Sequence, residues 1–522
     1  MLIMRMATER GGDKIPANLP EYPSILHALA FAARHVPDRP AFICEGLTLT
    51  YAELARAVGF MADRLQSLGA RGSRVVLMMS TSTEMAVASL GAMAAGAQVA
   101  PMNPNYTERE MTPLIADTEP AAIVCLPEYA EKARVQAAKI AGCQIEVVQP
   151  AGATIGAWAK DAGAALPKTL PEAADRSCIF FTGGTTGIPK GAEHNHAGLI
   201  AYGRQLTTLW PMSFDAERFL IVAPMFHVFG HHFSSIWPIY LRASVVLVPR
   251  YKPEVVLQEL GRHKITVFPG GPAAIYVGLL ACPDADKTDF SSLRICLAGG
   301  SPCSGTLLEN WEKKTGAPIL EGLGMSEGAP VTCSPAMAPR KLMSVGFVPP
   351  ETDIQIVDLE TGTRKMPTGE RGEIRVRGPQ FTLGYRNRPA ETANAIRDGW
   401  LYTGDIGYFD EEGYLFVVDR KKELILVGGY NVYPREVDEV LHSHPAVQEA
   451  AAVAAPDEFK GEVVKAFVAL KPGATLGEKE LVAWCAERLA PYKVPVAVVF
   501  LDALPKTGPA KIDKLALRGL RK

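Results

Sequence analysis

One segment in the first half of the chain combines the residue types that hold a polyphosphate. It reads Phe180-Phe181-Thr182-Gly183-Gly184-Thr185-Thr186-Gly187-Ile188-Pro189-Lys190-Gly191. Glycine lets backbone amides approach a ligand closely, threonine adds hydroxyl donors and lysine adds a cation. A Walker loop needs glycine before the lysine and serine or threonine after it, but Lys190 stands between Pro189 and Gly191. A surface turn without a ligand is the alternative interpretation.

This segment resembles the phosphate loop of the adenylate-forming (AMP-binding) superfamily, which includes acyl-CoA synthetases, aryl-CoA ligases, peptide-synthetase adenylation domains and firefly luciferase. Further motifs of that superfamily follow in order between about Tyr22 and Arg518. The resemblance implies that a carboxylic acid reacts with ATP to give acyl-AMP and pyrophosphate, and that coenzyme A then takes the acyl group. It implies ATP, Mg²⁺ and coenzyme A as cofactors. In the loop it implies ATP contacts from Thr182, Gly183, Gly184, Thr185, Thr186, Gly187 and Lys190.

A second motif supplies a candidate metal ligand. It comprises Glu321, Gly322, Leu323, Gly324, Met325, Ser326 and Glu327, all nucleotide-site positions by resemblance. Magnesium beside a triphosphate binds few carboxylates and several phosphate oxygens, so Glu327 is the expected ligand, with Thr182 beside it. Leu323 occupies a position that is commonly aromatic and stacks on adenine. The resemblance also implies nucleotide contacts from Gly299, Gly300 and Ser301.

The same segment raises a rival hypothesis. Residues 324–328 satisfy G-x-S-x-G, the nucleophile elbow of α/β-hydrolases, which would make Ser326 a nucleophile. Only His442 and His444 lie downstream as candidate bases, and no HGGG-type oxyanion segment lies upstream. A coincidental match is therefore the favoured interpretation.

The acid pocket is expected around residues 224–230, which resemble the next superfamily element. His227, Phe229 and Gly324 are the expected pocket residues. Phenylpropanoid ligases often have tyrosine at the position of Phe229, so its apolar ring favours an aliphatic acid. A medium- or long-chain fatty acid is the expected substrate, and an aryl acid stays open. His227, His231 and His232 have helical spacing, but no H-E-x-x-H motif or cysteine partner indicates a metal site.

The last quarter of the chain carries the remaining motifs. Asp405 and Arg420 are expected at the ribose, since a carboxylate accepts hydrogen bonds from two hydroxyls. By resemblance Lys422 is the hinge, and Gly428 with Gly429 lines the coenzyme A channel.

Lys511 lies in a terminal motif that resembles the superfamily's catalytic-lysine segment, with Ala510 in place of the usual glycine. The resemblance makes Lys511 a catalytic residue of adenylation, together with Thr182 and Glu327. No carrier segment follows it, so free coenzyme A is the expected acceptor. A catalytically silent nucleotide-binding relative is an alternative if Gly183, Leu323 and Ala510 reflect lost function.

Short apolar strands alternate with helical patterns through most of the chain, which predicts parallel sheets covered by helices. Thr50 and Glu53 have capping-box spacing at the start of one such helix. After Pro349 the strands are short and separated by turns, which predicts a β-barrel-like subdomain. We expect an α/β fold with a loose tail at 1–21, a large adenylation domain at 22–419 and a small mobile α+β domain at 420–522.

Composition limits the partners. The formal net charge of −2 offers no basic field for nucleic acid. The nine cysteines are scattered without C-x-x-C spacing, which favours a reducing, cytoplasmic location. The apolar run 85–102 is interrupted by Gln98 and Pro101, which predicts a buried helix and strand rather than a membrane span. Peripheral membrane contact and the oligomeric state stay open.

Overall fold

The computed structural model describes residues 20–149, 153–161, 163–182, 189–210, 212–300, 303–336, 338–507 and 511–520. The expected N-terminal tail falls almost entirely outside these residues. The chain divides into two compact units. Unit 1 comprises Met1–Asp353 with Arg377–Leu401, and unit 2 comprises Ile354–Val376 with Tyr402–Lys522.

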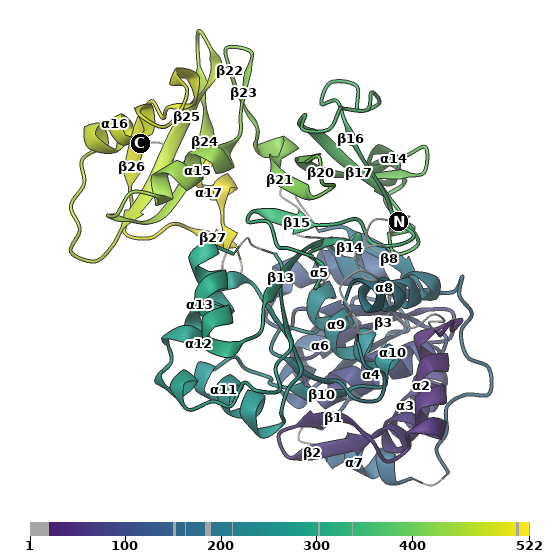
Figure 1. Ribbon diagram of the computed structural model, residues 1–522. Helices are drawn as coiled ribbons and strands as arrows, with labels where there is room; N and C mark the ends of the chain where they lie inside the picture. The colour runs from purple at the N-terminus through teal and green to yellow at the C-terminus, as the bar shows by residue number, and fades with distance from the viewer. Residues whose placement is uncertain are drawn as a thin grey trace. The chain divides into compact units, whose positions relative to one another are not determined.

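Unit 1 contains two large sheets in which most neighbouring strands are parallel (Figure 1). The eight-stranded sheet has the strand order β14 (Gly328–Cys333), β13 (Ile319–Met325), β12 (Ile295–Ala298), β11 (Val267–Gly271), β9 (Arg218–Ile221), β10 (Ser244–Leu247), β1 (Pro40–Cys44) and β2 (Leu47–Thr50). The seven-stranded sheet has the order β18 (Gly384–Tyr385), β8 (Gly191–Asn195), β7 (Arg176–Phe181), β4 (Gln98–Met102), β3 (Arg74–Met78), β5 (Ala122–Cys125) and β6 (Gln144–Val147). Antiparallel neighbours occur at β1–β2, β13–β14, β7–β8 and β8–β18.

Central strands of the sheets, such as β3, are apolar and buried on both faces. Along β3, Val75 and Leu77 belong to one buried cluster, whereas Val76 and Met78 belong to another. This alternation is the two-residue period of an extended strand. The helices of unit 1 are α2 (Ile25–His35), α3 (Tyr51–Ser67), α4 (Thr83–Ala94), α5 (Glu108–Thr118), α6 (Ala130–Ala137), α7 (Ala153–Lys160), α8 (His196–Leu209), α9 (Val228–Ser235), α10 (Trp237–Leu241), α11 (Pro253–Arg262), α12 (Ala273–Ala281), α13 (Gly305–Thr315) and α14 (Pro389–Ala395).

These helices form layers around the two sheets. Residues of α11, α12 and α13 share a buried cluster with the eight-stranded sheet, and these helices lie side by side in Figure 1. The predicted capping box is confirmed at the start of α3, where Thr50 and Glu53 bond reciprocally. The apolar run 85–102 forms α4 and β4, as expected. Among the described residues, no helix is both long and apolar enough to cross a bilayer.

Unit 2 begins with strands β16 (Asp353–Val357), β17 (Gly372–Arg377), β20 (Trp400–Phe409) and β21 (Leu415–Arg420). Short strands β15 (Ser344–Gly346) and β19 (Ile396–Arg397) belong to unit 1. Residues 354–376 thus belong to the same compact unit as the C-terminal segment. The boundary expected at 419–420 stays a proposal.

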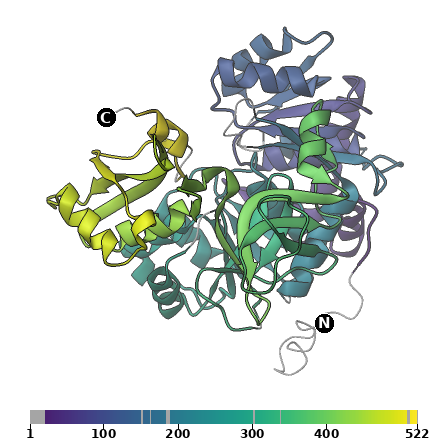
Figure 2. The ribbon, with the colours of Figure 1, turned by 90° about the horizontal axis from the view of Figure 1, so that it is seen from above.

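The C-terminal part of unit 2 is an α+β segment with its own core (Figure 2). Its sheet has the order β23 (Tyr430–Val432), β22 (Ile425–Val427), β25 (Gly461–Leu470) and β24 (Val447–Asp457), and β26 (Ala497–Phe500) pairs with β25. The helices are α15 (Pro434–His442), α16 (Glu478–Ala486) and α17 (Lys514–Gly519). A separate hairpin joins β27 (Lys506–Thr507) to β28 (Lys511–Ile512).

Candidate functional site

The predicted phosphate loop is the connection of the β7–β8 hairpin. Phe181 pairs with Gly191 at the end of the two strands. The backbone N–H of Thr182 donates to the carbonyl oxygen of Lys190 at 2.9 Å, and the N–H of Lys190 donates to Thr182 Oγ1 at 3.4 Å. The two ends of the loop are therefore closed on each other. Gly183, Gly184, Thr185, Thr186 and Gly187 lie outside the described residues.

The second motif is also a hairpin, formed by β13 and β14. A Cβ atom added at Gly322 would lie 3.2 Å from the Thr332 carbonyl oxygen, and one added at Gly324 would lie 3.2 Å from Ala329 Cβ. Glycine at these positions lets the two strands meet without a clash. Leu323 pairs with Thr332 across the ladder. Met325 pairs with Gly328, so Ser326 and Glu327 form the turn.

The two hairpins are in contact near their tips. Ser326 Oγ lies 3.5 Å from the Phe181 carbonyl oxygen, and the Nε2 of His194 on β8 lies 2.9 Å from the Ser326 carbonyl oxygen. The fold therefore brings the β13–β14 turn that carries Glu327 next to the ends of the hairpin that carries Thr182 and Lys190.

Glu327 is nearly buried and accepts a hydrogen bond from the Tyr385 hydroxyl at Oε1, over 2.6 Å. Burial, with Glu327 beside it, raises the pKa of Tyr385, so its hydroxyl stays protonated and donates. Within the described residues, Glu327 Oε2 accepts no hydrogen bond. Because Mg²⁺ at a triphosphate needs one carboxylate oxygen and phosphate oxygens, this arrangement fits the metal.

The hydrolase hypothesis for Ser326 is wrong. A nucleophile elbow turns from a strand into a helix, but Ser326 lies in a β-hairpin turn between β13 and β14. The histidine nearest in the hydrogen-bond network, His194, contacts the backbone carbonyl of Ser326 and not its Oγ. The G-x-S-x-G match is a coincidence of a glycine-rich hairpin.

Of the predicted acid-pocket residues, His227 and Phe229 lie at the start of α9, whereas Gly324 lies on β13. His227 caps this helix, since its Nδ1 accepts from the N–H of Phe229 at 3.3 Å. The Phe229 ring lies over backbone at the ends of β11 and β12, where a Cβ added at Gly299 would be 3.5 Å from Phe229 Cε2. A Cβ added at Gly271, which has a φ of +93°, would lie 3.9 Å from Phe229 Cε1.

His231 and His232 are buried and share one ring contact, Phe180, with His194, a residue that no sequence motif indicated. All three rings contact Phe180 edge to face. Burial lowers the pKa of His231 to about 3 and that of His194 to about 4, so both are neutral at physiological pH. Among the described residues, no group of three His, Cys, Asp or Glu side chains could hold a metal ion.

The loop after β12 carries Gly299 and Gly300, and Ser301 lies outside the described residues. Gly300 has a φ of +82°, which favours glycine. The Glu321 carboxylate accepts the N–H of Cys303 at 2.8 Å. Glu321 therefore anchors the loop on the carboxyl-end side of the sheet.

In unit 2, Asp405 on β20 and Arg420 on β21 are directly opposite in the ladder. Arg420 Nε lies 2.6 Å from Asp405 Oδ1, and the aspartate side chain is buried. The structure thus brings together the two residues predicted at the ribose. Asp419, which the motif search missed, accepts the backbone N–H groups of Arg420 at 2.7 Å and Arg435 at 2.8 Å.

The residues predicted for the hinge and the coenzyme A channel come next in the sequence, after β21. Lys422 lies in a 3-10 turn, Lys421–Glu423, immediately after β21. Gly428 and Gly429 form the turn between β22 and β23, with φ values of +56° and +87°. No atom lies within 4 Å of a Cβ built on either glycine.

Lys511 begins β28, and its backbone pairs with Thr507. Its side chain lies outside the described residues. Lys506 on β27 pairs with Glu449 at 2.5 Å, and Lys514 at the start of the following helix α17 pairs with the partly buried Asp438 at 2.7 Å.

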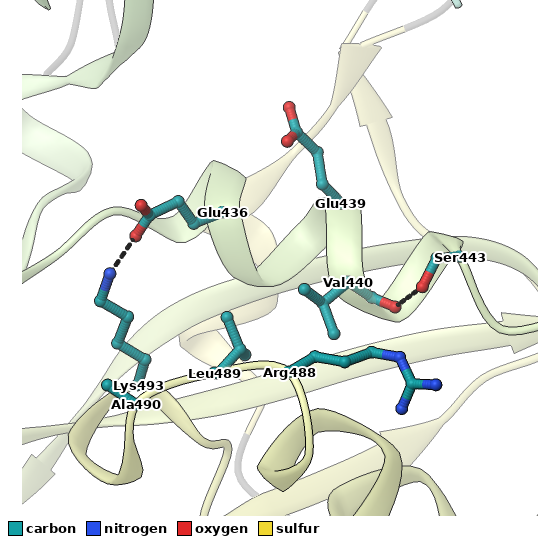
Figure 3. Close-up of a pocket in the computed structure, with 8 residues that line it drawn as sticks. All are labelled: Glu436, Glu439, Val440, Ser443, Arg488, Leu489, Ala490 and Lys493. Carbon is teal, nitrogen blue, oxygen red and sulfur yellow. Dashed lines mark hydrogen bonds and ion pairs between the residues drawn. The ribbon is translucent and has the colours of Figure 1, made fainter.

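A surface hollow of about 380 Å³ lies between α15 and the segment after α16 (Figure 3). Lys493 Nζ bonds Glu436 Oε2 at 2.6 Å, and Ser443 Oγ donates to the Val440 carbonyl oxygen at 2.6 Å. None of the predicted site residues lines it, and we assign it no ligand.

Comparison with known proteins identifies the family. The family model "AMP-binding enzyme" matches residues 29–386, and "AMP-binding enzyme C-terminal domain" matches residues 436–511. A long-chain-fatty-acid–CoA ligase of Bacillus subtilis (strain 168) is 36% identical over 96% of this chain and 95% of its own. A feruloyl-CoA synthase of Amycolatopsis sp is 35% identical over 93% of this chain and 96% of its own.

A solved structure agrees with the sequence matches. The ATP-bound MatB of Rhodopseudomonas palustris has 31% identity and a TM-score of 0.87, covering 95% of this chain and 98% of its own. The chain therefore belongs to the AMP-binding enzyme family, in its acyl-CoA ligase branch, whose members use ATP, Mg²⁺ and coenzyme A.

Proposed function

We propose that this chain converts a medium- or long-chain aliphatic acid into its coenzyme A thioester by way of an acyl-adenylate. The observation that carries the choice of acid is Phe229, an apolar ring lying over the backbone of Gly271 and Gly299. Such a ring offers dispersion contact to an alkyl chain and no hydrogen bond to a polar one. The long-chain-fatty-acid–CoA ligases among the relatives support this choice.

The chemistry of the first step is limited by charge. An acid carboxylate must attack an α-phosphorus whose oxygens are themselves anionic, so alignment and charge neutralisation lower the barrier. Mg²⁺, held by Glu327 beside Thr182, would neutralise phosphate charge. Lys190 and the loop residues Thr182 to Gly187 would hold the phosphates, and Lys511 would supply a further cation during adenylation.

In this proposal, separate sets of residues contact the nucleoside of ATP and the pantetheine arm of coenzyme A. Asp405 would accept both ribose hydroxyls, with Arg420 holding its carboxylate in place. Adenine would contact the segment 321–326. Lys422 would be the hinge of a domain 420–522 that moves relative to 22–419 between the half-reactions. The open turn at Gly428 and Gly429 would leave room for the pantetheine arm.

A hydroxylated aryl acid is a second candidate because of one buried hydroxyl. Tyr202 has no hydrogen-bond partner for its OH in the described part of the chain. The centroid of its ring lies 5.9 Å from the ring centroid of Phe233, which in turn lies 4.5 Å from that of Phe229. A buried hydroxyl without a partner costs about 1–3 kcal/mol, which a substrate hydroxyl would recover. The feruloyl-CoA synthases among the relatives agree with this alternative.

Pyrophosphate release with a panel of acids tests these assignments. We expect hexadecanoate and decanoate to give higher kcat/KM than ferulate, and thioester to form only when coenzyme A is added. A preference for ferulate would replace the aliphatic assignment with the aryl one. No acid-dependent pyrophosphate from any acid would indicate a catalytically silent relative.

We also infer a cytoplasmic location. All nine cysteines are free thiols, and seven of them are buried. Free thiols are typical of a reducing compartment. Fractionation of the native host, with recovery in the membrane pellet, would contradict it.

A further inference from the structure

Tyr385 is the one residue in the described part of the chain that contacts both Glu327 and the Lys190 side chain by a polar or cation–π interaction. Its hydroxyl donates to Glu327 Oε1 at 2.6 Å. The Nζ of Lys190 lies 4.2 Å from the centroid of its ring. One neutral side chain therefore contacts both a carboxylate and an ammonium.

The backbone around Tyr385 is fixed by several independent bonds. Tyr385 pairs with Ala192 in the β18–β8 ladder, and its N–H donates to Thr392 Oγ1 at 2.9 Å. Gly384 has a φ of +141°, and a Cβ there would lie 2.7 Å from Thr392 Cγ2. Only glycine fits this approach, so the strand presents Tyr385 in one position.

The same segment also holds the backbone of Glu327. The N–H of Thr382 donates to the Glu327 carbonyl oxygen at 2.6 Å, and Thr382 Oγ1 donates to the Glu193 carbonyl oxygen at 2.8 Å. Residues 382–385 thus link the β13–β14 turn to β8, the strand that follows the phosphate loop. Backbone and side chain of Glu327 are both fixed from this one segment.

The two contacts of Tyr385 act in the same direction. A phenol that donates to a carboxylate gains electron density, which strengthens the attraction of its ring face for an ammonium. The hydroxyl occupies Oε1 without neutralising the carboxylate charge, and this leaves Oε2 to a cation. A direct Lys190–Glu327 pair would instead cancel both charges.

We propose that Tyr385 is a positioning residue for adenylation: its hydroxyl sets the Glu327 carboxylate for Mg²⁺, and its ring holds Lys190 for the phosphates. In this proposal Tyr385 itself contacts neither the Mg²⁺ nor the phosphates. The inference rests on the proposed role of Glu327 as magnesium ligand. Loss of the hydroxyl therefore weakens metal binding, whereas loss of the ring also weakens metal-free ATP binding.

The hydroxyl is tested with Tyr385→Phe, and Tyr51→Phe is the matched control. Tyr51 is also buried but donates to a backbone carbonyl, Ala243 O, at 2.7 Å. Mn²⁺ binding is followed by the EPR signal of free Mn²⁺, with ATP present and acid absent. We expect about tenfold weaker Mn²⁺ binding in Tyr385→Phe and no change in Tyr51→Phe, since a bond to a charged group contributes about 1.5–3 kcal/mol. Unchanged Mn²⁺ binding in Tyr385→Phe would overturn the proposal.

A double-mutant cycle with Glu327→Gln separates this inference from the proposed function. If Glu327 binds the metal through the support of Tyr385, Glu327→Gln weakens Mn²⁺ binding and adding Tyr385→Phe causes no further loss. Additive losses would show that Tyr385 acts on metal binding by another route and would refute its positioning role. If Glu327→Gln leaves Mn²⁺ binding intact, the metal-ligand assignment fails and this inference fails with it.

The ring is tested by ATP binding in EDTA, measured by calorimetry. Tyr385→Leu is expected to bind ATP about threefold to tenfold more weakly than Tyr385→Phe, because only the leucine variant loses the cation–π contact. Thermal unfolding of both variants without nucleotide verifies that each is folded. Equal ATP affinity in two folded variants would refute the role of the ring.

Discussion

Two carboxylates of the candidate site, Glu327 in unit 1 and Asp405 in unit 2, are held by different kinds of partner. In unit 1, Glu327 accepts a hydrogen bond from the neutral phenol of Tyr385. In unit 2, Asp405 pairs directly with Arg420, and Asp438 pairs with Lys514. A neutral donor fixes the direction of a carboxylate and preserves its charge, whereas a cation both fixes and neutralises it. Glu327 is thus suited to an added metal ion, and Asp405 to neutral hydroxyl groups.

The largest effect in this comparison is expected from removing a cation, the ammonium of Lys511. If adenylation needs Lys511 of unit 2 in addition to the charges of unit 1, Lys511→Ala should lose about 10²–10³ in the rate of acyl-adenylate formation. Thioester formation from preformed acyl-adenylate should be spared. The two half-reactions are measured separately, with the exposed lysine variant Lys479→Ala as control. Equal losses in both half-reactions would contradict the assignment.

The next effect concerns the ribose pair. Asp405→Asn removes a two-oxygen acceptor and leaves Arg420 without this partner, so KM for ATP should rise about 10- to 100-fold with a smaller change in kcat. Asp353→Asn is the control, because its pair with Arg377 is exposed and such pairs contribute little. A fall in kcat at unchanged KM would mean that Asp405 acts on the chemical step instead.

A smaller effect is expected at the adenine position. Leu323→Tyr would add an aromatic face where the superfamily usually has one, and aromatic stacking contributes about 0.5–1.5 kcal/mol. KM for ATP should fall by about threefold to tenfold. Leu342→Tyr, at a position that is 57% exposed, serves as the control. A weaker ATP affinity in Leu323→Tyr would mean that the adenine does not contact this side chain.

The smallest effect on turnover is expected for Asp438, whose titration changes the stability of the fold. Burial raises the pKa of Asp438 to about 6, above the usual 3.8 of an aspartate, although Lys514 opposes the shift. The raised pKa contributes stability that is fully present below about pH 4 and is lost as the pH rises through about 6. Hydrogen exchange of β24 amides should therefore accelerate between pH 4 and 6, after correction for the intrinsic exchange rate. Asp438→Asn should lack this pH dependence.

Local features of the fold were predictable from sequence because they depend on neighbouring residues. The capping box at Thr50 and the helix followed by a strand in the run 85–102 were both confirmed. Asp405 and Arg420 were both expected at the ribose, and the structure pairs them across β20 and β21.

The remaining features depend on contacts between distant segments. Tyr385 reaches Glu327 across 58 positions of sequence, and nothing in the type or spacing of a lone tyrosine marks it. His194 joins His231 and His232 only because β8 and α9 both pack on Phe180. The G-x-S-x-G match misled for the same reason, since the pattern does not record whether a strand or a helix follows the serine.

The two-residue strand β18 also bears on the order of folding. It pairs with β8 at the edge of the seven-stranded sheet, although it follows β8 by some 190 residues. During synthesis, β7 and β8 leave the ribosome long before Gly384 and Tyr385 do. Until then β8 has an unpaired edge and Glu327 lacks its hydroxyl donor. A nascent chain that ends before residue 384 therefore exposes a strand edge that chaperones or other chains can pair with, and it lacks the tyrosine that supports the proposed metal ligand Glu327.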